Sequence, residues 1–420
     1  MQKREWYPLD NAANIYPVIQ NSRWTSMFRY MAALTAPANI DALQRALDKM
    51  RPRFPTFYMR LRSGIFWHYL EQTDTAAAVE TDTLYPCPPA FAGELPFRIK
   101  AYRNRIAGEF SHLICDGGGA MKFFSTLLAQ YYREQGIAVP TGGNILALDE
   151  APDPEEKENA FPRFARQGAR VTRSETRAYK VRGTALMPGM CCVTTGRLSV
   201  AAVLDKAHAY KVSITEYLTA TLVYVLYELQ KADHPQGMLK PVKVSVPVNL
   251  RKYYPSKTLR NFSQYLNPGI DPSLGDFTFQ ETLAQTHHYF HFMFTEKNLN
   301  ARLSINVNAE NNPVLRVIPL FIKRLGIRLV YELTGETAYT SVLSNVGALE
   351  LPDEIRPFVT RCDLMLKTAR RNAVECGVLS CDDALSITFT RVIAEPYVER
   401  MFFRKLVQDG LHVFVESNQL

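Results

Sequence analysis

One short run of the chain combines residue types that could do acid–base chemistry. The eleven residues from Phe110 read FSHLICDGGGA, so His112 follows an apolar stretch and Asp116 comes four residues later. Imidazole titrates near neutral pH, and a His that is held in place can take a proton from a hydroxyl, an amine or a thiol. The nearby Asp116 would hold the turn by accepting backbone N–H groups or by pairing with an arginine. The run predicts a general base at His112; the alternative is a core histidine whose spacing to Asp116 arose by chance.

Other candidate groups give weaker signals. Cys115 lies inside the same run, where strand alternation favours packing over a nucleophilic role. His287 and His291 are one helical turn apart, a spacing that can bind zinc. No glutamate follows His287 as it does in the protease motif, and aromatic residues separate the two histidines. We therefore expect an aromatic-rich helix face there and no metal site.

Strands and helices alternate around His112 in the first half of the chain. Apolar, β-compatible residues predict a strand at 26–34, a hairpin from 55–62 and 65–72, and a strand pair at 97–103 and 106–111. Helix-spaced apolar residues follow Asn39, and a second helix is expected from Met121 to Arg133. The strand at 106–111 would deliver His112 at its end, and the glycines after Asp116 would let the chain turn into the helix.

The second half repeats this mixture after a stretch of weak periodicity at 140–188, which we interpret as a connector. Helices are expected at 198–210, 214–230, 277–296, 314–333 (broken at Pro319) and 396–408, and strands at 242–248, 340–343, 358–366, 373–380, 385–392 and 411–416. The 314–333 segment is apolar with interleaved cations. We expect it to pack on the second domain with its Lys and Arg stems snorkelling; a helix on a membrane surface is the alternative.

Length and composition limit the possible classes of protein. The chain has 420 residues, 47% hydrophobic and 21% charged, which suits two globular domains of about 200 residues. The net charge of +8 favours anionic partners such as a phosphorylated cosubstrate, whereas the scattered cations argue against nucleic acid. No apolar run is long enough for a membrane span. Seven cysteines without framework spacing, and an N-terminus without a signal-peptide core, predict a cytoplasmic location.

Four stretches together resemble the CoA-dependent acyltransferase superfamily. The His112-x-x-x-Asp116-Gly117 run is similar to its His-x-x-x-Asp-Gly signature. Val246 to Arg251, followed by Asn261-Phe262, resembles its Pro-x-Asn-x-Arg…Asn segment, and Ser344 to Gly347 resembles its Ser-Asn-x-Gly turn. The closing 397–417 segment also agrees. The chain looks most similar to bacterial alcohol O-acetyltransferases and condensation-domain-like proteins, although Ser111 stands where many members have a first histidine.

The resemblance implies an α/β fold of two chloramphenicol-acetyltransferase-like subdomains, residues 1–180 and 181–420, packed around a central tunnel. It implies His112 as general base, Asp116 as structural support with Arg251 as its partner, and Gly117 as the source of backbone freedom. Ser344 and Asn345 would lie near the thioester. Three basic residues could meet the phosphates of the cosubstrate, with a solvated basic loop as the equal alternative: Lys252, Lys257 and Arg260.

The implied reaction is direct acyl transfer from acyl-CoA to a small alcohol or amine. It needs no metal, no permanently bound cofactor and no covalent acyl-enzyme. Two alternatives stay open: a condensation-type enzyme that takes acyl groups from an acyl carrier protein and forms an amide, and a binding module that keeps the fold without turnover. The substitution by Ser111 is the only support for the binding module.

Overall fold

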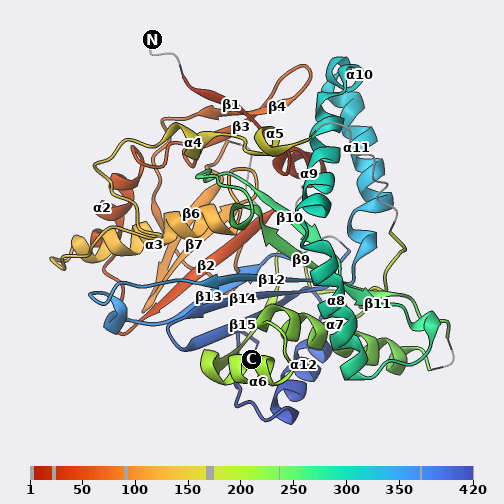
Figure 1. Cartoon of the computed structure of the whole chain (residues 1–420). Helices are drawn as coiled ribbons and strands as arrows, with labels where there is room; N and C mark the ends of the chain where they lie inside the picture. The colour runs from red at the N-terminus through yellow and green to blue at the C-terminus, as the bar shows by residue number, and fades with distance from the viewer. Residues whose placement is uncertain are drawn as a thin grey trace.

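A computed structural model describes residues 4–20, 25–88, 93–166, 175–235, 237–368 and 371–419. Figure 1 shows two main sheets, with helices on their outer faces and a helical group along one side. This confirms the α/β class. Part of the expected connector, residues 167–174, lies outside the described residues.

The first main sheet carries the strand that leads to His112. Its order is β13-β2-β7-β6-β5, and β2 pairs antiparallel with both β7 and β13. Helices α2 and α3 pack on each other and cover the sheet. The bounds are β2 Met27–Leu34, β5 Val79–Thr81, β6 Phe97–Tyr102, β7 Arg105–Ser111, β13 Val359–Leu366, α2 Ile40–Met50 and α3 Gly117–Arg133.

A small sheet of β1, β4 and β3 lies beside the first main sheet. Strands β3 and β4 form the hairpin predicted from 55–62 and 65–72, although both strands are shorter and Ser63 pairs with His68. The bounds of the remaining elements of this half are β1 Trp6–Pro8, β3 Met59–Ser63, β4 His68–Gln72, α1 Tyr16–Ile19, α4 Pro154–Lys157 and α5 Phe161–Phe164.

The second main sheet has the order β10-β9-β12-β14-β15-β8-β16, with β11 also pairing with β9. Strand β12 runs parallel to its two neighbours β9 and β14. The bounds are β8 Cys192–Ser199, β9 Val242–Asn249, β10 Ser263–Leu266, β11 Gly269–Ile270, β12 Ser341–Ala348, β14 Val374–Cys381, β15 Ala384–Arg391 and β16 Phe414–Ser417.

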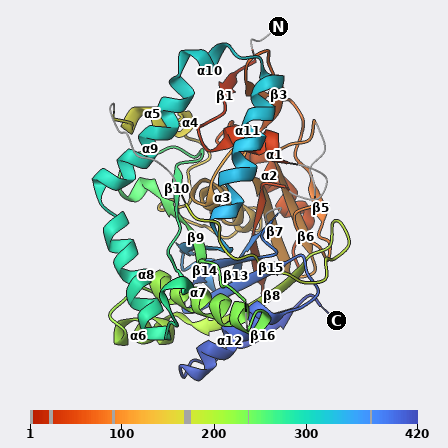
Figure 2. The same cartoon turned by 90° about the vertical axis from the view of Figure 1, so that its right-hand side faces the viewer.

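Helices α6, α7, α8 and α12 enclose the second core, which is separate from the first. Seen from the side, α9, α10 and α11 stand away from this layer and rise past the first half (Figure 2). The bounds are α6 Val200–Ala209, α7 Ile214–Asp233, α8 Phe279–Met293, α9 Glu296–Asn311, α10 Pro313–Val317, α11 Leu320–Thr334 and α12 Tyr397–Gln408.

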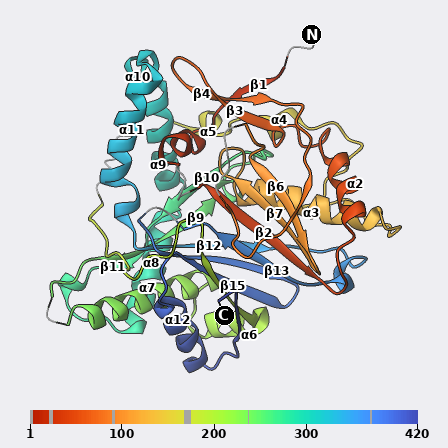
Figure 3. The ribbon, with the colours of Figure 1, turned by 180° about the vertical axis from the view of Figure 1, so that it is seen from behind.

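Strand β13 joins the two halves. It follows residue 358 in sequence, yet it pairs with β2 over Val359 to Leu366 and forms the edge of the first sheet. Figure 3 shows it crossing beside β2 from the second half. A Cβ on Gly377 of β14 would lie 2.3 Å from the Leu364 carbonyl oxygen, so the two sheets approach closely there. The halves therefore share a strand, and the boundary at residue 180 stays a prediction.

The periodicity of the sequence predicted the long strands and most long helices, but it missed or misplaced several elements. Strand β8 was not predicted, and the helix expected from Leu198 begins only at Val200, where Ser199 caps it. Helix α9 was not predicted either, because its apolar residues follow no clear helical stripe. Helix α3 begins at Gly117 instead of Met121, since Asp116 caps it there and the glycines form its first turn.

Helix α11 does not bury its apolar side as expected. Five of its large apolar residues are exposed: Phe321, Ile322, Leu325, Leu329 and Val330. Lys323 is the buried cation of this helix, and its ammonium donates to the carbonyl of Phe66 and lies 3.4 Å from the centre of the Trp67 ring. The prediction that α11 packs on the second domain with snorkelling cations is therefore wrong for this face. In the described part of the chain, no helix has both the length and the apolar character needed to cross a membrane.

Candidate functional site

His112 lies one residue beyond the end of β7. Its backbone N–H donates to the carbonyl of Ser26 at 2.9 Å, which fixes the chain at the end of the neighbouring strand. The imidazole stacks on Tyr16 with ring centres 5.5 Å apart and lies 4.5 Å from the ring centre of Phe28. The ring is thus enclosed by aromatic groups, while the residue keeps partial exposure.

Asn261, from the other half of the chain, holds both ends of His112. Its Oδ1 lies 3.4 Å from Nδ1 of the imidazole, and its Nδ2 donates to the His112 carbonyl at 2.8 Å. The same Nδ2 lies 3.0 and 3.2 Å from the carboxylate oxygens of Asp10, which is fully buried. Sequence reasoning quoted Asn261 in the resemblance without giving it a role, and it missed Asp10, because no motif surrounds that residue.

Burial sets the protonation of His112. Loss of water around the ring lowers the pKa of His112 below its usual value, and the Asp116 charge, Asn261 and a backbone hydrogen bond with Cys115 oppose this in part. The imidazole is therefore neutral at physiological pH. A neutral imidazole is the form that accepts a proton.

Asp116 accepts three hydrogen bonds, and these support a structural role for its carboxylate. Its Oδ1 accepts from the N–H of Gly119 at 3.1 Å and so caps α3. Its Oδ2 accepts from the N–H of Phe262 at 2.7 Å and from Arg251 Nη1 at 2.8 Å. The guanidinium of Arg251 also donates to the carbonyls of Thr258 and Arg260. This arrangement ties the turn after His112 to the loop that carries Asn261.

The glycines after Asp116 permit close packing rather than unusual dihedral angles. Gly117 does not have a positive φ. Its backbone conformation is therefore open to other residues, and the predicted role of Gly117 in backbone freedom does not explain why a glycine stands there. A Cβ on Gly117 would lie 3.0 Å from Val346 Cγ1, and one on Gly119 would lie 1.9 Å from the Leu259 carbonyl oxygen. The missing side chains let the 344–347 turn and the 249–262 loop approach α3.

Ser344 and Asn345 lie on β12, next to the residue that contacts Gly117. Ser344 is buried. Asn345 Nδ2 donates to Thr215 Oγ1 at 3.0 Å, and its Oδ1 accepts from the N–H of Gly347 at 3.0 Å. The structure therefore brings this turn to the start of α3 through Val346, while the Asn345 side chain is held by the first turn of α7.

The three predicted phosphate contacts separate in the structure. Lys252 and Lys257 are exposed, and Lys257 donates to Asp153 at 2.7 Å. Arg260 is 2% exposed; it donates to the carbonyl of Pro8 and lies 3.7 Å from Asp10. The prediction that Arg260 contacts the phosphates is therefore wrong, because its guanidinium faces the interior.

Lys122 is a further cation that sequence reasoning missed. It lies on α3, and burial lowers its pKa, with the nearby positive charges of Arg251, Arg53 and Lys257 acting in the same direction. Lys122 lies three residues after Gly119 and gave no sequence signal, because a lone lysine on a helix is usually solvated.

The neighbours Ser111 and Cys115 have packing roles. Ser111 is buried, and its Oγ lies 3.0 Å from Ser26 Oγ and accepts from the N–H of Leu113. Cys115 is fully buried, and burial raises the pKa of its thiol well above the usual value, so the thiol stays protonated.

Solved structures with the same architecture cover almost the whole chain. The trichothecene 15-O-acetyltransferase from Fusarium sporotrichioides matches with a TM-score of 0.63 at 11% identity, over 97% of this chain and 94% of its own. Polyketide synthase associated protein 5 from Mycobacterium tuberculosis matches with a TM-score of 0.60 at 13% identity, over 95% and 96%. This chain has the chloramphenicol-acetyltransferase-like fold. The sequence itself matches no family model and no curated protein.

The fold is shared by proteins with more than one named role. The epimerization domain from the third module of tyrocidine synthetase B matches with a TM-score of 0.60 at 10% identity, over 97% of this chain and 96% of its own. The two-subdomain fold expected from the resemblance is therefore confirmed, and the named O-acetyltransferase and the epimerization domain both have it. Because one fold hosts several reactions, the reaction must be argued from the site. The central tunnel stays a prediction.

Proposed function

We propose that this protein is an acyltransferase that moves an acyl group from acyl-CoA directly to a hydroxyl or amine acceptor, with His112 as general base. The observation that carries the proposal is the held imidazole: burial lowers its pKa, Asn261 from the opposite half of the chain fixes it, and the residue as a whole keeps partial exposure. A structural histidine needs no such exposure, whereas a base needs a face open to substrate.

The reaction proceeds by proton transfer and acyl substitution. The acceptor O–H or N–H gives its proton to His112 as its oxygen or nitrogen forms a bond to the thioester carbonyl carbon. The carbonyl becomes a tetrahedral oxyanion, the C–S bond then breaks, and the CoA sulfur takes the proton from the imidazolium. Atoms and charge balance without a metal, a bound cofactor or an acyl-enzyme.

Ser344 and Asn345 are proposed to shape the thioester side of the site. Support comes from the close approach of Val346 to Gly117, which brings their turn to the start of α3. The buried Ser344 and the backbone around it are candidates to face the oxyanion.

Lys252 and Lys257 are proposed to attract the phosphates of the donor, because both are exposed on the loop that Arg251 anchors to Asp116. An acyl carrier protein would present its thioester without the 3′-phosphoadenosine part of CoA. Comparing the two donors therefore tests the condensation-type alternative together with the role of these lysines.

The test is release of free thiol from acetyl-CoA and longer acyl-CoAs in the presence of alcohols and amines. General base catalysis contributes roughly 10²–10⁴-fold, so His112→Ala and His112→Gln are expected to lower acceptor-dependent turnover by about that factor. His208→Ala on α6, an exposed histidine in the second half, is the matched control and should keep full activity.

Activity that survives both His112 substitutions would remove this residue from the mechanism. Turnover only with an acyl group on a carrier protein would replace CoA as donor. Tight acyl-CoA binding without turnover toward any acceptor would favour the binding module. Circular dichroism of each variant separates a loss of chemistry from a loss of folding.

A further inference from the structure

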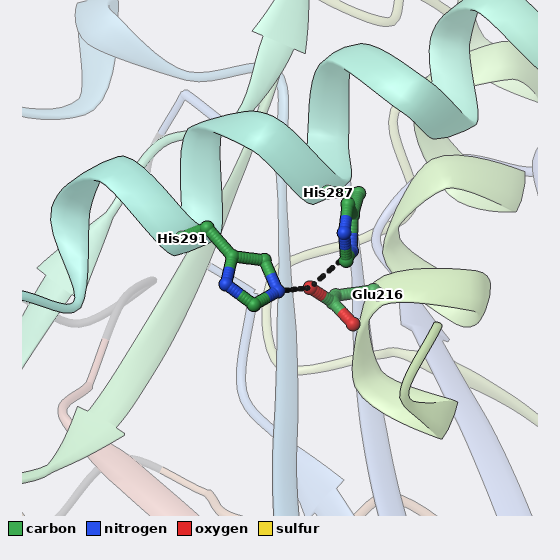
Figure 4. A group of neighbouring side chains, drawn as sticks. All are labelled: Glu216, His287 and His291. Carbon is green, nitrogen blue, oxygen red and sulfur yellow. Dashed lines mark hydrogen bonds and ion pairs between the residues drawn. The ribbon is translucent and has the colours of Figure 1, made fainter. Parts of the chain in front are cut away.

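Three metal-ligating side chains meet far from His112 in sequence and outside the proposed active site. Glu216 lies in the first turn of α7, and His287 and His291 lie one turn apart on α8, which packs against α7. Their ligand atoms all lie within 4.8 Å of one another. Figure 4 shows both imidazoles directed at the same carboxylate.

Two histidines, where an ion pair would need only one, lie near the same carboxylate oxygen of Glu216. His287 Nδ1 lies 3.1 Å and His291 Nε2 lies 3.9 Å from the same oxygen, Glu216 Oε1. The first distance is a hydrogen bond, but the second is too long for one. Ligand atoms about 2.0–2.2 Å from a tetrahedral ion are themselves separated by roughly 3.3 Å, so a small movement of the exposed His291 ring brings all three atoms to coordinating distance.

The carboxylate is already oriented for this task. Its other oxygen, Glu216 Oε2, accepts from the backbone N–H of Ser213 at 2.7 Å, in the capping box that starts α7. Oε1 is thereby left to face the histidines. Fixing a ligand through such an outer hydrogen bond is what supports a metal ion in proteins. Glu216 is 8% exposed, whereas His291 is largely exposed, so an ion can enter from solvent.

We propose that Glu216, His287 and His291 form a zinc site that joins α7 to α8. Two imidazole nitrogens and one carboxylate oxygen are a set that binds Zn²⁺ with a fourth position open to water. The sequence expectation of an aromatic helix face without metal considered only the histidines, because Glu216 lies 71 residues before His287. The proposal does not depend on the acyltransferase activity.

A bound zinc ion would link the first turn of α7, which contacts Asn345 of the proposed active site, to α8. Thr215, the residue before Glu216, accepts the hydrogen bond from Asn345. Zinc would therefore stabilise the α7–α8 pair and the support of Asn345. It would not take part in the proton transfer at His112.

The test uses tag-free, chelator-treated protein titrated with ZnCl₂ in competition with a chromophoric chelator, and with CoCl₂ to read the d–d absorption of the bound ion. We expect one ion per chain. His291→Ala, at an exposed position, should weaken zinc binding at least about 100-fold, since loss even of an outer-shell partner costs 10–100-fold. Glu216→Gln keeps a group able to cap α7 and should weaken binding similarly.

His288→Ala is the matched control, since this exposed neighbour on α8 is not one of the three ligands. It should bind zinc as the wild type does. The seven cysteines are all buried and free, so they offer no competing surface site. Wild-type affinity equal to that of His291→Ala, or equal loss in His288→Ala, would overturn the proposal and leave an ordinary Glu–His contact. A zinc-dependent rise in melting temperature that His291→Ala abolishes would support it.

Discussion

At the scale of single residues, His112 and Asp116 have different partners: Asp116 holds the turn after His112, and Asn261 holds the imidazole. The carboxylate of Asp116 is fully used in capping α3 and in binding Arg251 and the N–H of Phe262. The imidazole is instead held by Asn261. Asp116 therefore positions the turn, and it is not the partner that orients the base.

The pH dependence of kcat/KM should report the buried imidazole. The neutral ring is the active form, so activity falls as acid protonates it. Because burial lowers the pKa of His112, half-maximal kcat/KM on the acid side is expected below the ordinary histidine value of about 6.5. Steady-state rates between pH 4.5 and 8 measure this limb. A limb above 6.5, or one that persists in the residual activity of His112→Gln, would contradict the assignment.

Restoring a second histidine at position 111 should not improve the enzyme. Ser111 is buried and hydrogen-bonded to Ser26, so an imidazole there would add volume to a packed interior. Overpacking a core typically costs about 1–3 kcal/mol, so Ser111→His is expected to lower the free energy of unfolding by that amount. Urea denaturation checks this, with Ser111→Ala as the smaller variant. A stable and faster Ser111→His enzyme would show that the site tolerates the double-histidine pattern.

At the scale of elements, the start of α3 is packed too tightly against the 249–262 loop to admit a side chain at Gly119. Its cap, Asp116, and its glycines let the Leu259 carbonyl come within a distance that any side chain would block. The loop with Asn261 lies directly behind that carbonyl. The contact explains why the base and its holder come from different halves of the chain.

Gly119→Ala tests this contact. Its Cβ would lie 1.9 Å from a backbone oxygen, which cannot move aside as a flexible side chain would. We expect destabilisation by about 1–3 kcal/mol or more, measured by urea denaturation, together with loss of activity. Gly326→Ala on α11 is the control: its Cβ meets nothing within 4 Å, and alanine favours a helix, so stability should hold or rise.

At the scale of the whole molecule, contacts from several elements join the two halves of the chain. Strand β13 completes the edge of the first sheet, and the Asp116–Arg251 ion pair and the Asn261–His112 contact also cross between the halves. The first sheet and the candidate active site therefore both depend on contacts between the two halves of the chain.

A fragment of residues 1–180 should therefore fail to fold cooperatively. Without β13, strand β2 would expose an unpaired edge and the apolar residues beneath it. We expect a fragment with little fixed tertiary structure and a tendency to aggregate, as seen by near-UV circular dichroism and analytical centrifugation. A monomeric fragment with a sharp unfolding transition would show that the first half is independent.

The sequence by itself determined the local features. Apolar periodicity placed most strands and helices, and the His112–Asp116–Gly117 run with its three companion stretches indicated the fold that the solved structures share. These signals are readable because strand alternation, helical spacing and short motifs involve residues close together in the chain.

Only the tertiary structure decided which distant residues meet. It brought Asn261 to His112, Asp10 to Asn261, Glu216 to His287, and β13 to the first sheet. It also turned Arg260 inward and left one face of α11 exposed. The physical reason is common to all of these: such contacts join residues tens to hundreds of positions apart, and the packing of whole elements sets them, whereas local periodicity records only that a residue is apolar or polar.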